Sequence, residues 1–242
     1  MRIKLISIVA VVAALAVGVT ASQASLTGGS NVKVSLPKAG GPAKVTIVIN
    51  NTDNVLVPQR VSSVVVTSKA AKWNSKAVPY CRKTVPTNAA GNNNGASIRC
   101  PKKSRVGTGK FTVNIGNPGQ PIPTDLGIIN GAINVYNYKP KSGQQAALLF
   151  EQIADRPIPD THVYILAGVT KSGVYSATIP NTIDLPPAVS NLLRNPDLSY
   201  RTTALASVAV TLKSPPAKKR KRPFLTVKNL KKLDFSVVLN RD

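Results

Sequence analysis

The residues best suited to chemistry gather in one short region of the chain. Asp155 and Asp160 flank the string "RPIP", Glu151 precedes them, and His162 follows in "DTHVYIL". Paired carboxylates can carry out glycoside hydrolysis or bind calcium. Here a cation, Arg156, separates the two aspartates, prolines dictate the loop, and no Asp-x-Asp-x-Asp spacing appears. The pattern favours a solvated loop, and a hydrolase that uses these carboxylates is only the third interpretation.

His162 is the only histidine, and it alternates with Tyr164 and Leu166 along an expected strand. A lone histidine on a strand usually has a structural role, and a metal site needs more His or Cys ligands than this chain has. The Ser-x-x-Lys match at 35–38 contains a proline, which discourages the helix that its chemistry requires. We therefore predict no enzymatic activity, no cofactor and no metal site.

Cys81 and Cys100 are the only cysteines. In an exported chain they most simply pair with each other. The chain-entropy model gives a bridge across a loop of about twenty residues roughly 3 kcal/mol of stability. Two free thiols are the alternative.

Cations far outnumber acids in this chain. It has 32 Lys and Arg residues against 9 Asp and Glu, which gives a formal net charge of +23. Residues 54–124 and 213–232 contain no acid at all, and the second stretch includes the run "PPAKKRKRP". Charge of this size attracts anionic surfaces and polymers, and such binding weakens steeply as salt rises.

We predict that the basic patches 69–110, within the first stretch, and 213–232 bind polyanions, either an anionic cell-wall polymer or an acidic polysaccharide. The residues assigned to this role are Lys102, Lys103, Arg105, Lys218, Lys219, Arg220, Lys221 and Arg222. Nucleic acid would bind non-specifically at most, because only Trp73, Tyr80 and Phe224 offer stacking rings near the cations. Two alternatives stay open: a merely solvated charged surface, and a soluble structural or adhesion-like module whose protein partner binds a sheet edge.

Residues 1–24 have the three parts of a secretory signal peptide. Arg2 and Lys4 precede an apolar run, and Ser22 and Ala24 provide the small residues of a cleavage site. We predict a protein that is secreted or associated with the cell envelope, so a nuclear address in "KKRKR" is excluded. An uncleaved anchor is the alternative, although the run is shorter than the ~20 residues that span a bilayer. No later segment has the length and apolarity of a membrane helix.

Short segments of alternating or β-branched apolar residues recur along the rest of the chain and predict strands. The segments are 31–36, 43–50, 60–68, 110–116, 131–138, 146–153, 161–170, 174–180, 204–212 and 233–240. In the third segment Val61, Val64 and Val66 cannot share one face of a regular strand, so we expect a bulge or burial on both faces. The predicted fold class is all-β, an immunoglobulin-like or related antiparallel β-sandwich of about ten strands with one short helix.

The short helix is expected over 184–196, "DLPPAVSNLLRNP", where Asp184 offers an N-cap and prolines occupy the first turn. The Gly- and Pro-rich string at 116–125 is either a linker or a crossover between sheets. Few clear strands precede it, which favours one domain. We expect a single domain over 25–242, with the basic segment 213–232 as an excursion between two strands.

The string "CPKKSRVGTGKFTV" at 100–113 resembles a Cys-Pro-x-x-Ser-x-Val/Ile-Gly-x-Gly motif of secreted β-rich proteins of unknown function from actinobacteria. In those proteins a cysteine and hydrophobic strands lie upstream, as Cys81 and 43–68 do here. Many of them carry further cysteines near the C-terminus, which this chain lacks. The resemblance implies export and a β-sandwich, and it implies no activity. Physically, Gly107 and Gly109 permit positive φ or a bulge before the next strand.

Overall fold

The computed structural model shows an all-β, antiparallel protein, which confirms the predicted fold class at that level. The residues that it describes are 22–25, 31–34, 44–50, 61–67, 71–87, 94–116, 128–155, 161–178, 182–184, 200–213, 223–227 and 236–241. No α-helix occurs among these residues. The helix predicted at 184–196 lies outside them except for Asp184, which ends a strand.

The strands carry most of the described chain. They are β1 (Ser22–Ser25), β2 (Asn31–Val34), β3 (Lys44–Asn50), β4 (Val61–Thr67), β5 (Ala71–Trp73), β6 (Asn94–Gly95), β7 (Arg105–Gly116), β8 (Ile128–Tyr138), β9 (Gln144–Ala154), β10 (His162–Thr170), β11 (Val174–Thr178), β12 (Thr182–Asp184), β13 (Tyr200–Lys213), β14 (Leu225–Val227) and β15 (Ser236–Arg241). Two short 3-10 turns are η1 (Ser75–Ala77) and η2 (Lys102–Ser104). Each of the predicted strand segments overlaps one of these strands.

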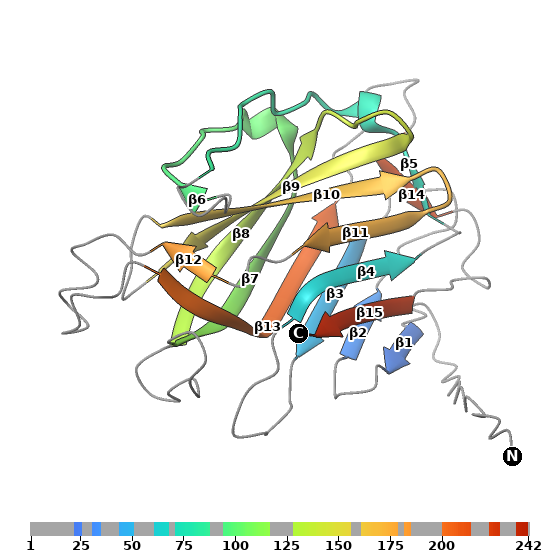
Figure 1. Cartoon of the computed structure of the whole chain (residues 1–242). Coiled ribbons are helices and arrows are strands. Elements are labelled where there is room, and N and C mark those ends of the chain that lie inside the picture. Colours follow the sequence, from blue (N-terminus) through green and yellow to red (C-terminus); the bar gives the residue numbers. More distant parts are fainter. Residues whose placement is uncertain are drawn as a thin grey trace, which may run out of the picture.

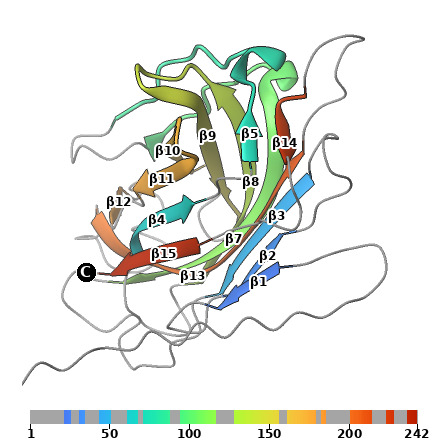
Figure 2. The ribbon, with the colours of Figure 1, turned by 90° about the vertical axis from the view of Figure 1, so that its right-hand side faces the viewer.

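One sheet of eleven strands dominates the structure (Figure 1). Its order is β12-β13-β7-β8-β9-β10-β11-β4-β15, with β3 beside the C-terminal half of β13 and β6 beside the start of β10. Figure 2 shows that the sheet curls round like half of a barrel. The described strands therefore form one continuous curled sheet, whereas the sequence suggested the two separate layers of a sandwich.

The uninterrupted meander from β7 to β11 explains this difference. Each of these strands pairs with the next one along the chain, so none of them crosses to a second layer. Gly143 and Gly173 have φ of 81° and 86° in the turns after β8 and β10. This left-handed conformation suits glycine and lets the chain reverse within a few residues.

Side chains on the inner face of the curled sheet form the main core. Paired residues on neighbouring strands lie on the same face, so the strand register identifies this face. Its buried members include Phe111, Ile133, Leu148, Ile165 and Val210. The residues between them in each strand point to the outer face, where the cations and most of the polar residues of β7 and β8 lie.

β4 contains a register shift at the place where the sequence predicts a bulge. The residues of β15 pair one by one with β4 until Asn240 meets Ser63, and Arg241 then pairs with Val61. Ser62 is skipped. The extra residue in β4 is the expected bulge.

Gly107 and Gly109 lie inside β7, which begins at Arg105 and is longer than predicted. Neither has positive φ, so that expectation is wrong. The bulge that was the alternative is present just before them, because the pairing with β8 passes from Arg105 to Gly107 and skips Val106. A Cβ atom on Gly107 would lie 2.7 Å from the carbonyl oxygen of Thr211. Glycine is needed there for the close approach of β13.

Two small sheets accompany the large one. β5 pairs with β14, and Figure 2 shows this pair over one end of the curled sheet. Trp73 and Phe224 pack edge to face there, with ring centroids 5.6 Å apart. β1 pairs with β2 and includes both Ala24 and Ser25, so cleavage at the predicted signal-peptide site would divide β1.

Gly131 provides a test of the core packing. It lies opposite Phe111 on the inner face, and a Cβ atom there would collide with the Phe111 ring and with the carbonyl oxygen of Ile153. We expect Gly131→Ala to lower the free energy of unfolding by about 1–3 kcal/mol in denaturant titrations, as overpacking does. Ala132→Ser, at the adjacent exposed position, should change it by less than about 0.5 kcal/mol. Equal effects of the two variants would contradict this account of the core.

Candidate functional site

The most elaborate part of the structure is a long excursion between β5 and β7. We call residues 74–104 the cap; of these, 88–93 lie outside the described residues. The cap passes the end of β8, where the Cys81 N–H donates to the Asn137 carbonyl over 2.8 Å. It then covers the outer face of β8, β9 and β10, and β6 within it pairs with β10 (Figure 1).

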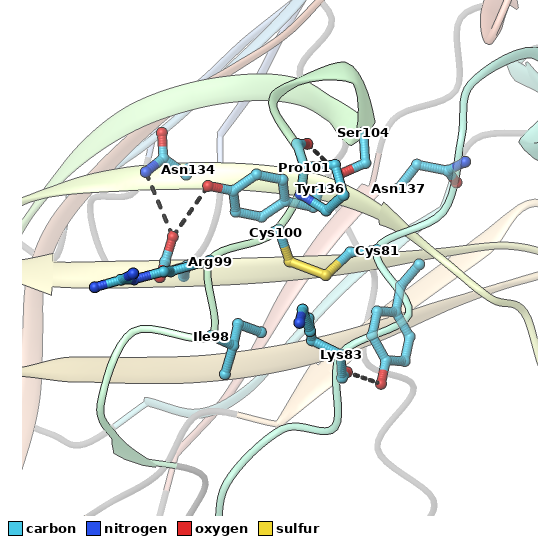
Figure 3. Close-up of a disulfide and its surroundings, with 12 residues drawn as sticks. Cys81, Lys83, Ile98, Arg99, Cys100, Pro101, Ser104, Asn134, Tyr136 and Asn137 are labelled. Carbon is cyan, nitrogen blue, oxygen red and sulfur yellow. Dashed lines mark hydrogen bonds between the residues drawn. A yellow bond between two sulfur atoms is a disulfide. The ribbon is translucent and has the colours of Figure 1, made fainter.

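The predicted disulfide between Cys81 and Cys100 is present and joins the two ends of this excursion (Figure 3). Cys81 is fully buried and packs with Tyr136, Leu149 and Tyr164 from the outer face of the sheet. The sulfur bridge therefore lies in a second, smaller hydrophobic core between the cap and the sheet. The chain on both sides of it is fixed by this packing as well as by the covalent bond.

Asn137 anchors the first part of the cap. It is fully buried, and its Nδ2 group donates to the carbonyl oxygens of Ser75 and Val78 over 2.8 and 2.7 Å. Buried carbonyl groups outside a ladder need such partners, because leaving them unpaired costs free energy. The side-chain amide of Asn137 thus supplies the hydrogen-bond donors that a neighbouring strand supplies in a regular β-ladder.

Glu151 anchors the second part. It is the only glutamate in the chain, lies on the outer face of β9 and is 3% exposed. Its Oε2 accepts a hydrogen bond of 3.1 Å from the Tyr136 hydroxyl, and its Oε1 lies 3.1 Å from His162 Nδ1. The Ser97 hydroxyl of the cap donates to the same Oε1 over 3.4 Å. A buried carboxylate needs such partners, and here they come from both the sheet and the cap.

The Tyr164 hydroxyl ties the cap backbone to this cluster. It donates to the Ala96 carbonyl over 2.8 Å and accepts a 3.1 Å hydrogen bond from the Ile98 N–H. Burial, and then the nearby negative charge of Glu151, raise the pKa of Tyr136 to about 12. Burial also raises the pKa of Tyr164 to about 12. Both phenols therefore stay protonated as donors throughout the neutral range.

The carboxylate and histidine considered for chemistry are thus brought together in an unforeseen way. Glu151 and His162 meet in a buried cluster, whereas their order in the sequence places Glu151 with Asp155 and Asp160. Asp155 is exposed beyond the end of β9, and Asp160 lies outside the described residues. The period-two pattern of β9 and β10 was the available signal, but the register that pairs Glu151 with Tyr164 was not readable from it. The geometry is that of an anchor for the cap.

The cations of the motif at 100–113 are displayed on the surface. Lys102 and Lys103 occupy η2 and are exposed. This turn is held by Ser104, which is fully buried and donates through Oγ to the Pro101 carbonyl over 2.6 Å. Arg105, exposed at the start of β7, donates from Nη1 to Asn134 Oδ1 over 3.5 Å. The three predicted binding residues of this stretch are therefore neighbours on a fixed backbone.

Further exposed cations occur in the cap and in the adjoining turn. Exposed members of the group are Lys76, Arg82, Lys83 and Arg99 in the cap, and Lys139 and Lys141 in the adjoining β8–β9 turn. The Tyr138 hydroxyl donates to the Lys83 carbonyl over 2.9 Å and fixes the backbone there (Figure 3). Arg99 has φ of 49°, a conformation that is uncommon for residues other than glycine. We call these six cations, with Lys102, Lys103 and Arg105, the cationic surface.

The remaining predicted binding residues, 218–222, lie outside the described part of the chain. Of the aromatic residues near the cations, Trp73 and Phe224 pack against each other, and the half-buried Tyr80 donates to the Ser75 hydroxyl over 3.2 Å. Within the described ranges, no group of three His, Cys, Asp or Glu side chains is arranged to hold a metal ion. No described helix has the length and apolarity needed to cross a membrane.

No family model, curated protein or solved structure matches the chain. The interpretation of the site therefore depends on its geometry and chemistry.

The raised tyrosine pKa values predict a loss of stability in alkaline solution. The pKa of Tyr136 and of Tyr164 is about 12 in the folded protein, whereas it is 10.0 in an unfolded chain. Stability from this difference is fully present below pH 10 and is lost as the pH rises from about 10 to 12. The free energy of unfolding should fall over this range, and less so in Tyr136→Phe. Ionisation of all the tyrosines near pH 10 in the folded protein, followed by phenolate absorbance, would contradict this.

Removal of the disulfide should loosen the cap. Cys81→Ala/Cys100→Ala is expected to lower the free energy of unfolding by about 3 kcal/mol, because the bridge closes a loop with a sequence separation of 19. Denaturant titration of this variant, beside the reduced and oxidised native sequence, measures the effect. An unchanged unfolding midpoint would show that packing alone holds the cap.

Proposed function

We propose that the protein is exported and associates electrostatically with an anionic polymer of the cell envelope or its surroundings through the cationic surface. The observation that carries the proposal is that these cations are exposed on the cap, the start of β7 and the adjoining turn, where the disulfide, Asn137 and Glu151 fix the backbone. Residues 54–124 contain no acid that could neutralise them. The one glutamate nearby is buried beneath the cap.

Mutual repulsion makes this arrangement costly unless it has a partner. Like charges held close together destabilise the compact state, and counter-ions or a polyanion relieve the repulsion. A flexible loop would spread its cations apart, but the cap is prevented from doing so by its anchors. Lysine and arginine at fixed positions lose little freedom when they meet phosphate or carboxylate groups, so each such pairing contributes more to the affinity.

Two features support a place outside the cytoplasm and no catalytic role. A disulfide persists in oxidising compartments, which agrees with the predicted signal peptide over 1–24. The Glu151–His162 pair is used as a buried anchor. The relation of the curled sheet to an immunoglobulin-like sandwich stays a prediction, supported by the antiparallel strands and the shared apolar inner face.

Binding of the purified protein to isolated cell envelopes across a salt gradient tests the proposal. We expect retention at low salt and release at high salt, with Lys102→Gln/Lys103→Gln/Arg105→Gln released at clearly lower salt. The slope of log K against log salt should fall by about one unit for each phosphate group that the variant no longer neutralises. Lys103→Gln and Lys171→Gln form a matched pair, because both remove one exposed lysine and only the first lies on the cationic surface.

Two results would count against the proposal. Equal effects of Lys103→Gln and Lys171→Gln would mean that only net charge matters. If the envelopes do not retain the native protein at low salt, the polyanion hypothesis is wrong. The alternative, a module that binds a protein partner, is then favoured. A further variant with residues 218–222 all changed to Gln measures the share of the second basic stretch.

A further inference from the structure

A second surface adjoins the cationic surface on the outer face of β8, β7, β13 and β3. The register aligns one residue from each strand into a row across the sheet. The first row consists of Asn134, Thr108, Thr211 and Thr46. Arg105, which belongs to the cationic surface, donates to Asn134 at one end of it. The two surfaces are therefore continuous.

Two more rows lie parallel to the first. The second row consists of Ala132, Lys110, Ala209 and Val48, and the third of Asn130, Thr112 and Ser207. Neighbouring strands are about 4.8 Å apart and alternate residues of a strand about 6.7 Å apart, so these side chains form a regular grid. We call the three rows the polar face. All of its residues are exposed or half-buried.

Hydroxyl groups of the polar face are fixed by one another. The Thr46 and Thr211 hydroxyl oxygens are 3.0 Å apart, and the Thr112 hydroxyl donates to Asn130 Oδ1 over 2.7 Å. A hydroxyl group has one donor and two acceptor sites, so each retains hydrogen-bonding capacity toward solvent. Such a face matches a partner that itself presents many hydroxyl groups. It offers no aromatic side chain and only small apolar ones, which is unfavourable for a protein hot spot.

The charges of this region select an anionic partner. Lys110 lies in the middle of the polar face. Lys44 on β3 and Lys213 on β13 are opposite each other in the strand register, at the same margin as Arg105. Two described acids adjoin the polar face. Glu151 is buried and accepts a 3.5 Å hydrogen bond from Asn134 Nδ2, and Asp155 is at the opposite margin, where its N–H donates to the Asn130 carbonyl. Exposed cations become more numerous from the polar face toward the cationic surface, and the acid where the two surfaces meet, Glu151, is buried.

We propose that the polar face binds the sugar rings of an acidic polysaccharide whose charged groups are held by the cationic surface. This rests on the proposed function and names the class of polymer. The threonine, serine and asparagine side chains form hydrogen bonds with the hydroxyl groups of the sugar rings. Ala132 and Ala209 leave room for the polysaccharide, and Lys110 pairs with one of its carboxylates. A polyanion without sugar rings uses only the cationic surface.

Binding of alginate and of poly-glutamate tests this proposal, because both polymers carry carboxylates and only alginate has sugar rings. We expect the native protein to bind alginate more tightly than poly-glutamate at equal salt and equal carboxylate concentration. Thr108→Val/Thr211→Val keeps the shape and strand preference of both residues and removes two hydroxyl groups. It should weaken alginate binding about ten-fold and leave poly-glutamate binding unchanged. Thr178→Val, exposed on β11, is the matched control and should bind both as before.

A second variant distinguishes a change in binding from a change in folding, because it is expected to affect the two polymers in opposite directions. Ala209→Lys places a long cation in the middle of the polar face, so it should weaken alginate binding through obstruction and strengthen poly-glutamate binding through charge. Equal affinity of the native protein for the two polymers, or unchanged alginate binding in both variants, would overturn the proposal while leaving the cationic surface intact. Failure to bind either polymer at low salt would overturn the proposed function as well.

Discussion

Docking of the cap depends on the Glu151 carboxylate, which lies between the sheet and the cap and accepts hydrogen bonds from both. Tyr136 and His162 hold it from the sheet, and Ser97 reaches it from the cap. A carboxylate removed from water is stable only when its oxygen atoms are paired in this way. In a chain with so few acids, one carboxylate at this point offsets part of the repulsion among the cations above it.

The disulfide and the Asn137 amide complete the attachment at the other end. Together the three anchors turn a long irregular segment into a fixed surface, although the segment has little regular secondary structure of its own. Rigidity matters for function because a preformed array of cations loses less freedom on binding than a mobile one. Arg105 then links this array to the hydroxyl groups on the neighbouring strands, so charge and hydrogen bonding are presented on one continuous surface.

The sequence predicted the strands well because their patterns are local. Alternation of apolar residues and β-branched composition located every long strand, and the crowding of Val61, Val64 and Val66 predicted the bulge in β4. The pairing of Cys81 with Cys100 followed from their number and the predicted compartment. The short strands β1, β5, β6, β12 and β14 were missed, because pairing with other strands and not their composition makes them strands.

The arrangement of the strands and the anchor cluster were beyond the sequence patterns. A sandwich and a curled sheet use the same alternating strands, and only the order of pairing distinguishes them. Glu151 meets His162 because β9 and β10 pair in one register, and a slip by one residue would turn one of the two side chains to the opposite face. Lys102, Lys103 and Arg105 are exposed, as an acid-free run of cations must be, and their role in binding stays a prediction.

Hydrogen exchange of individual cap amides tests most directly whether the cap is anchored to the sheet. The Ile98 N–H bonds to the Tyr164 hydroxyl and the Cys81 N–H to the Asn137 carbonyl. The account predicts that both amides exchange nearly as slowly as the amides of β9 in the native protein, and that the Ile98 amide exchanges much faster in Glu151→Ala while β9 stays protected. Rapid exchange at Ile98 and Cys81 in the native protein, beside a protected β9, would show an unanchored cap and contradict the account.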